Sequence, residues 1–195
     1  MQVSIPTSAL KAAIHCAATK DIRYYLNGVN LEFCHGDVPH INLISTDGHV
    51  LSALRVPLVY REGAQTADFS LIVPLSAIVS ATKGAGKVIT LSSMLDGRYA
   101  LGDTLVLPID DRFPDWQRVI PMTTGLTPAS ATYRPEFLLR GAKCLRDFFN
   151  APKLIPTMLC RGDDGGIMHN GDNSAVVVIM PSKSINLPDY KGFAA

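Results

Sequence analysis

The segments IPTSAL (5–10), VPLSAI (73–78) and YRPEFL (133–138) decide the fold of this 195-residue chain, because they repeat one pattern. Each has an apolar or aromatic lead-in, a proline and then a sequence that begins a helix. Proline suits the first turn of a helix, where its missing N–H has no intrahelical partner to lose. Because the pattern recurs at similar intervals, we predict three units of similar length.

Apolar segments and Gly/Asp turns follow each predicted helix, which is typical of antiparallel strands. We expect strands over 22–34, 40–46 and 49–58 in the first unit, 87–92, 98–101 and 104–109 in the second, and 155–161, 166–169 and 174–181 in the third. Each unit is therefore a βαβββ repeat, and the fold class is α+β. Residues 110–130 are rich in Pro, Asp and Thr and are predicted to link the second unit to the third.

The composition excludes several classes of protein. The chain is 47% apolar and 18% charged with a net charge of +1, so any DNA contact must come from local charge or from topology. No apolar run reaches the roughly 20 residues that a membrane helix requires, and the N-terminus lacks the pattern of a signal peptide. The spacing of the four cysteines gives no zinc or disulfide framework, which favours a cytoplasmic location.

Candidate catalytic and metal-binding residues are few. The cluster of Cys34, His35 and His40 is a possible metal site, or else a strand end running into a turn. Asp47 and His49 are a possible acid–base pair, although Asp-Gly is a common turn sequence. The pairs at 110–111 and 163–164 are possible ion ligands or ordinary acidic turns. Without a phosphate-binding loop, nucleophile elbow or HExxH motif, we expect no enzyme, no metal and no cofactor.

Four ordered motifs carry a resemblance to a known family. DIRYYLNGV (21–29), STDGH (45–49), RFPDWQRVIP (112–121) and VVVIMP (176–181) closely resemble the bacterial sliding clamp, the beta subunit of DNA polymerase III. The resemblance implies a DNA clamp fold, with helices on the inner face of a ring, antiparallel sheets outside, and double-stranded DNA held by encirclement.

The chain also departs from the family pattern. The family has three domains of two units each, whereas only three units are predicted here. Residues 1–120 resemble the middle domain, 130–182 resemble the second half of the last domain, and 183–195 form an additional C-terminal tail. The third unit therefore has no predicted partner within the chain, and we expect homo-oligomerisation through the sheet edge that it would expose.

Helical periodicity places Arg140, Lys143 and Arg146 opposite the apolar face of the third predicted helix. Under the resemblance this basic stripe faces DNA, together with Lys11 and Lys83 of the other helices; the alternative is an ordinary solvated face. Tyr24 and Tyr25 are predicted on a strand with side chains on opposite faces. One of them is then part of the core, and Tyr24 is also a candidate to stack on a base.

The resemblance also implies a pocket that binds short peptides of polymerases or repair proteins. The matching positions are Leu26, Thr46, Gly48, His49, Leu51, Pro121, Val178, Met180 and Pro181. Val50 and Ser182 stand where the family has an arginine and a methionine, which puts affinity for standard partner peptides in doubt. The tail segment SINLP (184–188) resembles the extended, leucine-anchored peptides that such pockets accept; an unstructured tail is the alternative.

The function predicted from the sequence is that of a non-catalytic, clamp-like processivity factor that tethers a polymerase or another partner to DNA. The alternative is a clamp mimic that binds the partner peptides without encircling DNA.

Overall fold

The computed structural model describes residues 1–63, 67–122, 124–128, 132–160 and 164–182. The first unit contains β1 (Gln2–Pro6), α1 (Thr7–Ala13), η1 (Tyr24–Leu26), β2 (Gly28–Cys34), β3 (His40–Thr46), β4 (Val50–Pro57) and β5 (Val59–Glu62). The second contains β6 (Phe69–Pro74), α2 (Leu75–Thr82), β7 (Val88–Ser93), η2 (Leu95–Gly97), β8 (Tyr99–Leu101) and β9 (Thr104–Val106). The third contains α3 (Pro135–Phe148), β11 (Thr157–Cys160), β12 (Gly166–His169) and β13 (Ala175–Ile179), preceded by η3 (Trp116–Val119) and β10 (Thr127–Pro128).

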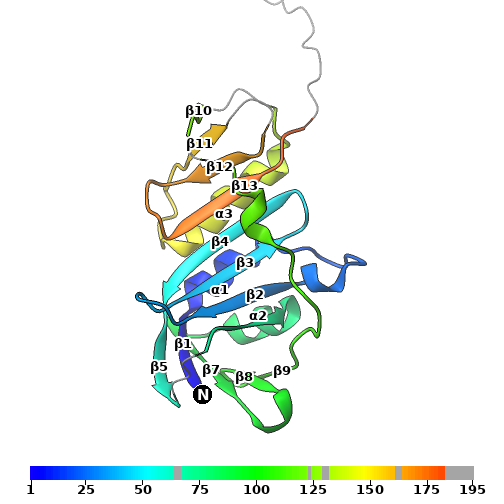
Figure 1. Cartoon of the computed structure of the whole chain (residues 1–195), viewed down its shortest axis with the longest axis vertical. Coiled ribbons are helices and arrows are strands. Elements are labelled where there is room, and N and C mark those ends of the chain that lie inside the picture. Colours follow the sequence, from blue (N-terminus) through cyan, green and yellow to red (C-terminus); the bar gives the residue numbers. More distant parts are fainter. Residues whose placement is uncertain (64–66, 123, 129–131, 161–163, 183–195) are drawn as a thin grey trace, which may run out of the picture.

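The first two units exchange their leading strands. β1 pairs with β7 of the second unit, and β6 pairs with β2 of the first. The result is a five-stranded sheet in the order β5-β1-β7-β8-β9 and an eight-stranded sheet in the order β10-β11-β12-β13-β4-β3-β2-β6. Because each unit completes a sheet of the other, the first two units form one body (Figure 1).

The third unit joins the first at a sheet edge. β13 pairs with β4 in antiparallel register from Ala175–Leu54 to Ile179–Val50. The expectation that this unit has no partner within the chain is therefore wrong: the apolar β13 continues the sheet of the first unit, and among the described residues β10 is the last strand at the far end of that sheet. The division into domains at 1–120 and 130–182 stays a prediction, and the predicted tail at 183–195 lies outside the described residues.

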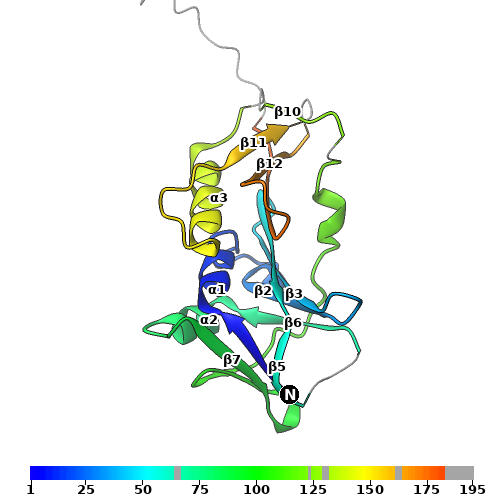
Figure 2. The same ribbon diagram turned by 90° about the vertical axis from the view of Figure 1, so that its left-hand side faces the viewer.

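All three helices lie on one face of the sheets, and the segment that contains η3 crosses the opposite, outer face of the eight-stranded sheet (Figure 2). The main core lies between the helices and the sheets and draws on all three units, for example through Leu10, Ile78 and Leu145. A smaller apolar cluster lies on the outer face around Trp116. The α+β class expected from the repeat is confirmed.

The predicted strand over 22–34 begins later than expected, at Gly28. Residues before it form a loop and the 3-10 turn η1, in which the N–H of Leu26 donates to the Arg23 carbonyl and that of Asn27 to the Tyr24 carbonyl. The placement of both tyrosines on a strand is therefore wrong. Tyr24 is 73% exposed, while Leu26 provides the buried side chain of this segment.

Candidate functional site

A groove of about 220 Å³ lies on the outer face of the sheet, where the first unit, the third unit and the linker meet. We call it the outer groove. It lies beside η1, the turn between β3 and β4, the segment around η3, and the end of β13. The residues that line it are Arg23, Tyr25, Leu26, Thr46, Gly48, His49, Val50, Leu51, Phe113, Pro114, Asp115, Trp116, Val119, Val178 and Met180.

The turn between β3 and β4 is held rigidly on one side of the outer groove. The Asp47 carboxylate accepts the backbone N–H groups of His49 and Val50 at 2.8 and 2.9 Å. Gly48 has a φ of +93°, and a Cβ there would lie 3.3 Å from the Arg23 guanidinium, so the turn favours glycine. The N–H of Met180 donates to the His49 carbonyl at 2.8 Å, which ties this turn to the third unit.

The floor of the outer groove is apolar. Leu51 and Val178, side by side on β4 and β13, pack in one cluster with Ile44, Ala53 and Trp116. The Trp116 indole N–H donates to Glu32 Oε1 at 2.9 Å, which fixes the linker on the sheet. An apolar floor with a few polar groups at the rim is the usual chemistry of a site for a small or extended ligand.

Seven of the nine predicted peptide-binding residues line this one groove, and Pro121 and Pro181 do not. Sequence reasoning missed the linker side chains Trp116 and Val119, and also Arg23, which belongs to the first motif. Trp116 is the only tryptophan of the chain, and a lone tryptophan in a polar linker is a signal of docking that the sequence does contain.

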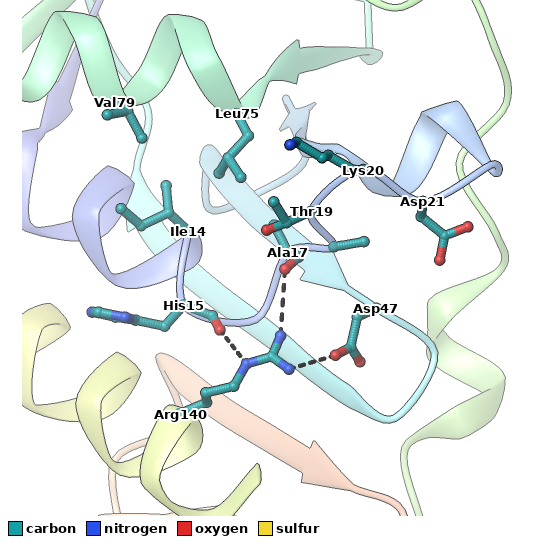
Figure 3. Close-up of a pocket in the computed structure, with 11 residues that line it drawn as sticks. Ile14, His15, Ala17, Thr19, Lys20, Asp21, Asp47, Leu75, Val79 and Arg140 are labelled. Carbon is teal, nitrogen blue, oxygen red and sulfur yellow. Dashed lines mark hydrogen bonds and ion pairs between the residues drawn. The ribbon is translucent and has the colours of Figure 1, made fainter. Parts of the chain in front are cut away.

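Arg140 does not lie on a free helix face. Its guanidinium reaches from α3 to the first unit, where it donates to the carbonyls of His15 and Ala17 at 2.7 and 3.3 Å and pairs with the Asp47 carboxylate (Figure 3). These groups border an open hollow of about 700 Å³ beside α1, α2 and α3. The carbonyls beyond the C-terminal end of α1 need donors, and Arg140 supplies them.

The pair with Arg140 changes the protonation of Asp47. Burial raises the pKa of this carboxyl, but hydrogen bonds from the Val50 N–H, the Arg140 guanidinium and the His49 N–H outweigh burial and lower it below its usual value. The His49 ring lies 4.0 Å from the Asp47 carboxylate and is 62% exposed, stacked on Phe137. Asp47 therefore acts as a structural acceptor, and the arrangement does not favour an acid–base pair with His49.

The other predicted DNA-facing cations divide into two kinds. Arg146 donates to the Leu154 carbonyl at 2.9 Å and so secures the loop after α3. Lys11, Lys83 and Lys143 are exposed on the helix side. Between α1 and α3, His15 pairs with Asp147 at 2.7 Å, which adds a second polar contact between the first and third units.

The candidate metal ligands are held by other contacts. His35 contacts Asp68 at 3.2 Å and the Tyr60 hydroxyl at 2.5 Å, and burial raises the pKa of the Cys34 thiol. Within the described ranges, no group of three His, Cys, Asp or Glu side chains is placed to hold a metal ion. Asp163 lies outside these ranges. No helix in the part of the chain that the structure describes is long and apolar enough to cross a membrane.

No protein-family model matches the chain. Among curated proteins, it is similar to the beta sliding clamp of Vibrio cholerae, with 27% identity over 181 residues that cover 88% of this chain and 45% of the relative. The beta sliding clamp of Escherichia coli K12 is 31% identical over 141 residues, 62% of this chain and 34% of the relative. The chain thus spans less than half the length of these relatives.

Solved structures give the same likeness. A DNA polymerase sliding clamp from Pseudomonas aeruginosa matches with a TM-score of 0.69 at 18% identity, over 94% of this chain and 66% of that one. The clamp from Bacillus subtilis matches with a TM-score of 0.69 at 14% identity, over 95% and 65%. The resemblance to bacterial sliding clamps is therefore confirmed.

Proposed function

We propose that the chain acts as a non-catalytic sliding clamp of reduced size, which encircles double-stranded DNA as a homo-oligomer in the cytoplasm and tethers a polymerase or repair protein. One observation carries the proposal: all three helices lie on one face of the sheets, and the outer groove opens on the other face. This separation leaves one face for DNA and the other for a protein partner.

The helix face suits a weak grip on DNA. Lys11, Lys83 and Lys143 are the predicted DNA-facing cations that remain exposed and outside the ion pairs described above. Three phosphate contacts per chain give a shallow, salt-sensitive attraction. Such an attraction allows movement along the duplex, so topology rather than affinity has to retain the protein.

Encirclement requires further copies of the chain, because one molecule supplies only an arc. β9 and β10 each end a sheet, at opposite ends of the molecule (Figure 1). Apolar side chains are exposed near these ends, with Leu105 and Leu107 at β9 and Met122 and Ile155 towards the third unit. We place the contacts between copies at these ends, since an apolar sheet edge favours pairing with another chain.

The outer groove is proposed as the site for short peptide segments of the partner. Leu26, Leu51 and Val178 provide apolar walls, and Met180 provides a pliable one. Thr46, Gly48 and His49 bring backbone and polar groups to the rim. Pro121 and Pro181 do not line the groove. They are proposed to act through their neighbours in the chain, since Ile120 packs against the apolar cluster of the floor and Met180 lines the groove.

Retention on closed DNA tests encirclement. The protein is incubated with nicked circular duplex DNA, separated from free protein by gel filtration, and the DNA is then cut once with a restriction enzyme. We expect the protein to stay with circular DNA and to leave after cutting, and light scattering to report an oligomer. Equal retention on circular and linear DNA, or a strictly monomeric protein, contradicts encirclement.

A matched pair of linker variants tests the outer groove. Val119→Arg fills the groove with a long charged side chain, whereas Gln117→Arg adds the same side chain to an exposed linker position that does not line it. In primer extension by a bacterial replicative polymerase, we expect Val119→Arg to abolish the gain in product length and Gln117→Arg to preserve it. Equal behaviour of the two variants contradicts the groove as the docking site.

A further inference from the structure

We propose that residues 184–193 bind back into the outer groove of their own molecule and compete there with partner peptides. This inference rests on the proposed function of the groove as a peptide site. Under this inference a segment of the same chain occupies the groove, and partner peptides bind only when that segment leaves.

The position where the segment begins supports this assignment. Met180 lines the outer groove, and its N–H is bonded to the His49 carbonyl. The N–H of Ser182 donates to the Thr132 carbonyl at 2.7 Å, so the backbone is fixed up to this residue, two positions after Met180. Residues 183–195 lie outside the described residues and follow directly.

The chemistry of the segment matches the walls of the groove. Residues 184–193 read SINLPDYKGF and contain the apolar side chains Ile185 and Leu187. Pro188 restricts the residue before it to extended backbone. If the bound segment is extended, positions two apart share a side, and Ile185 and Leu187 would then present their side chains to one surface. The floor around Leu51 and Val178 offers such a surface.

The stretch of chain between the fixed backbone and the apolar residues of the segment is short. Ile185 follows Ser182 by three residues, which span at most about 11 Å when extended. A segment tethered this closely has an effective concentration of about 1 mM. If the free segment binds with a Kd of about 0.1 mM, it occupies the groove in roughly ten of eleven molecules, and an external peptide then binds about tenfold more weakly.

The test uses the full chain and a fluorescein-labelled peptide with the sequence of residues 184–193 as the probe. Binding is measured by fluorescence anisotropy to the wild-type chain and to the double variant Ile185→Asp/Leu187→Asp. We expect the double variant, with its groove open, to bind the probe about tenfold more tightly than the wild type. Asn186→Ala, between the two changed positions, is the control and is expected to bind as the wild type does.

Adding Val119→Arg to the double variant is expected to abolish probe binding, which locates the probe in the outer groove. Equal affinity of the wild type and the double variant overturns the inference, as does failure of the probe to bind the double variant. A difference that grows with protein concentration also overturns it, because the segment would then occupy a neighbour's groove. The primer-extension comparison of Val119→Arg and Gln117→Arg is independent of these outcomes, so the proposed function stands or falls separately.

Discussion

The two faces of the sheet use their polar and charged side chains differently. On the helix face, Arg140 and Arg146 donate hydrogen bonds to backbone carbonyls of the same chain, and Arg140 also pairs with a carboxylate. On the outer face, the polar groups around Trp116 and Asp47 hold a linker and a turn, and leave an apolar groove between them. We infer that a basic residue on a helix face is free to bind a ligand only if no unpaired carbonyl lies within reach of its side chain.

The largest expected effect comes from breaking the Arg140 contact. Arg140→Ala removes the ionic partner of Asp47 Oδ2 and the donor to two carbonyls, and we expect a loss of about 3 kcal/mol in the free energy of unfolding. Lys143→Ala, on the same helix, is expected to change it by less than about 0.5 kcal/mol. Urea unfolding monitored by circular dichroism measures both, and equal losses would refute the structural role of Arg140.

A smaller loss is expected on the outer face. Trp116→Ala removes the anchor of the linker, and we expect a loss of about 2 kcal/mol, less than for a fully enclosed ring because the linker can detach locally. Trp116→Phe keeps the apolar contact but loses the hydrogen bond to Glu32, and we expect it to lower the free energy of unfolding by about 1 kcal/mol. If both variants unfold like the wild type, Trp116 does not hold the linker on the sheet.

Protonation of Asp47 at low pH tests the same contact. We expect it to lower the free energy of unfolding by less than Arg140→Ala does, because Arg140 keeps its two carbonyl acceptors. The folded-state pKa of Asp47 lies below its unfolded value of about 3.9. Its contribution to stability is therefore present above about pH 4 and is lost as the pH falls through the folded pKa. We expect Asp47→Asn to lose less stability than the wild type between pH 5 and pH 2. Parallel stability curves for the two proteins would contradict this assignment.

The smallest expected effect concerns the cations that stay free on the helix face. Lys143→Ala removes one phosphate contact and is expected to reduce the salt slope of DNA binding by about 0.9, with little change in stability. Leu139→Ala, at a neighbouring exposed position of α3, is the control and leaves the slope unchanged. If Lys143→Ala leaves the salt slope of DNA binding unchanged, DNA does not contact the helix face at Lys143.

Much of the fold was predictable from the sequence, because the repeated proline motifs mark the start of each helix and the Gly/Asp turns mark strand ends. The predicted strands at 40–46 and 166–169 coincide with β3 and β12. The strand predicted to begin at residue 22 was wrong for residues 22–27. The isoleucine and tyrosines of this segment favour strand, whereas local backbone hydrogen bonds form the 3-10 turn η1 within it.

The candidate site was predictable in part. Turn residues such as Gly48 and strand residues such as Val178 were named through the resemblance of the motifs that contain them, and the structure places both in the lining of the outer groove. The partner of Arg140 was not predictable, since it depends on how α3 meets the loop after α1, more than 100 positions away in the chain. Helical periodicity gives the direction of a side chain but not what lies opposite it.

The way in which the units are joined bears on how proteins of this architecture change length. Reciprocal exchange of β1 and β6 joins the first two units, since removing either would take strands from the sheet of the other. The third unit is attached along one side of the first unit, through β13 and α3. Gain or loss of whole units is thus least disruptive at such one-sided boundaries, and we expect natural length variants of this architecture to differ there by complete repeats.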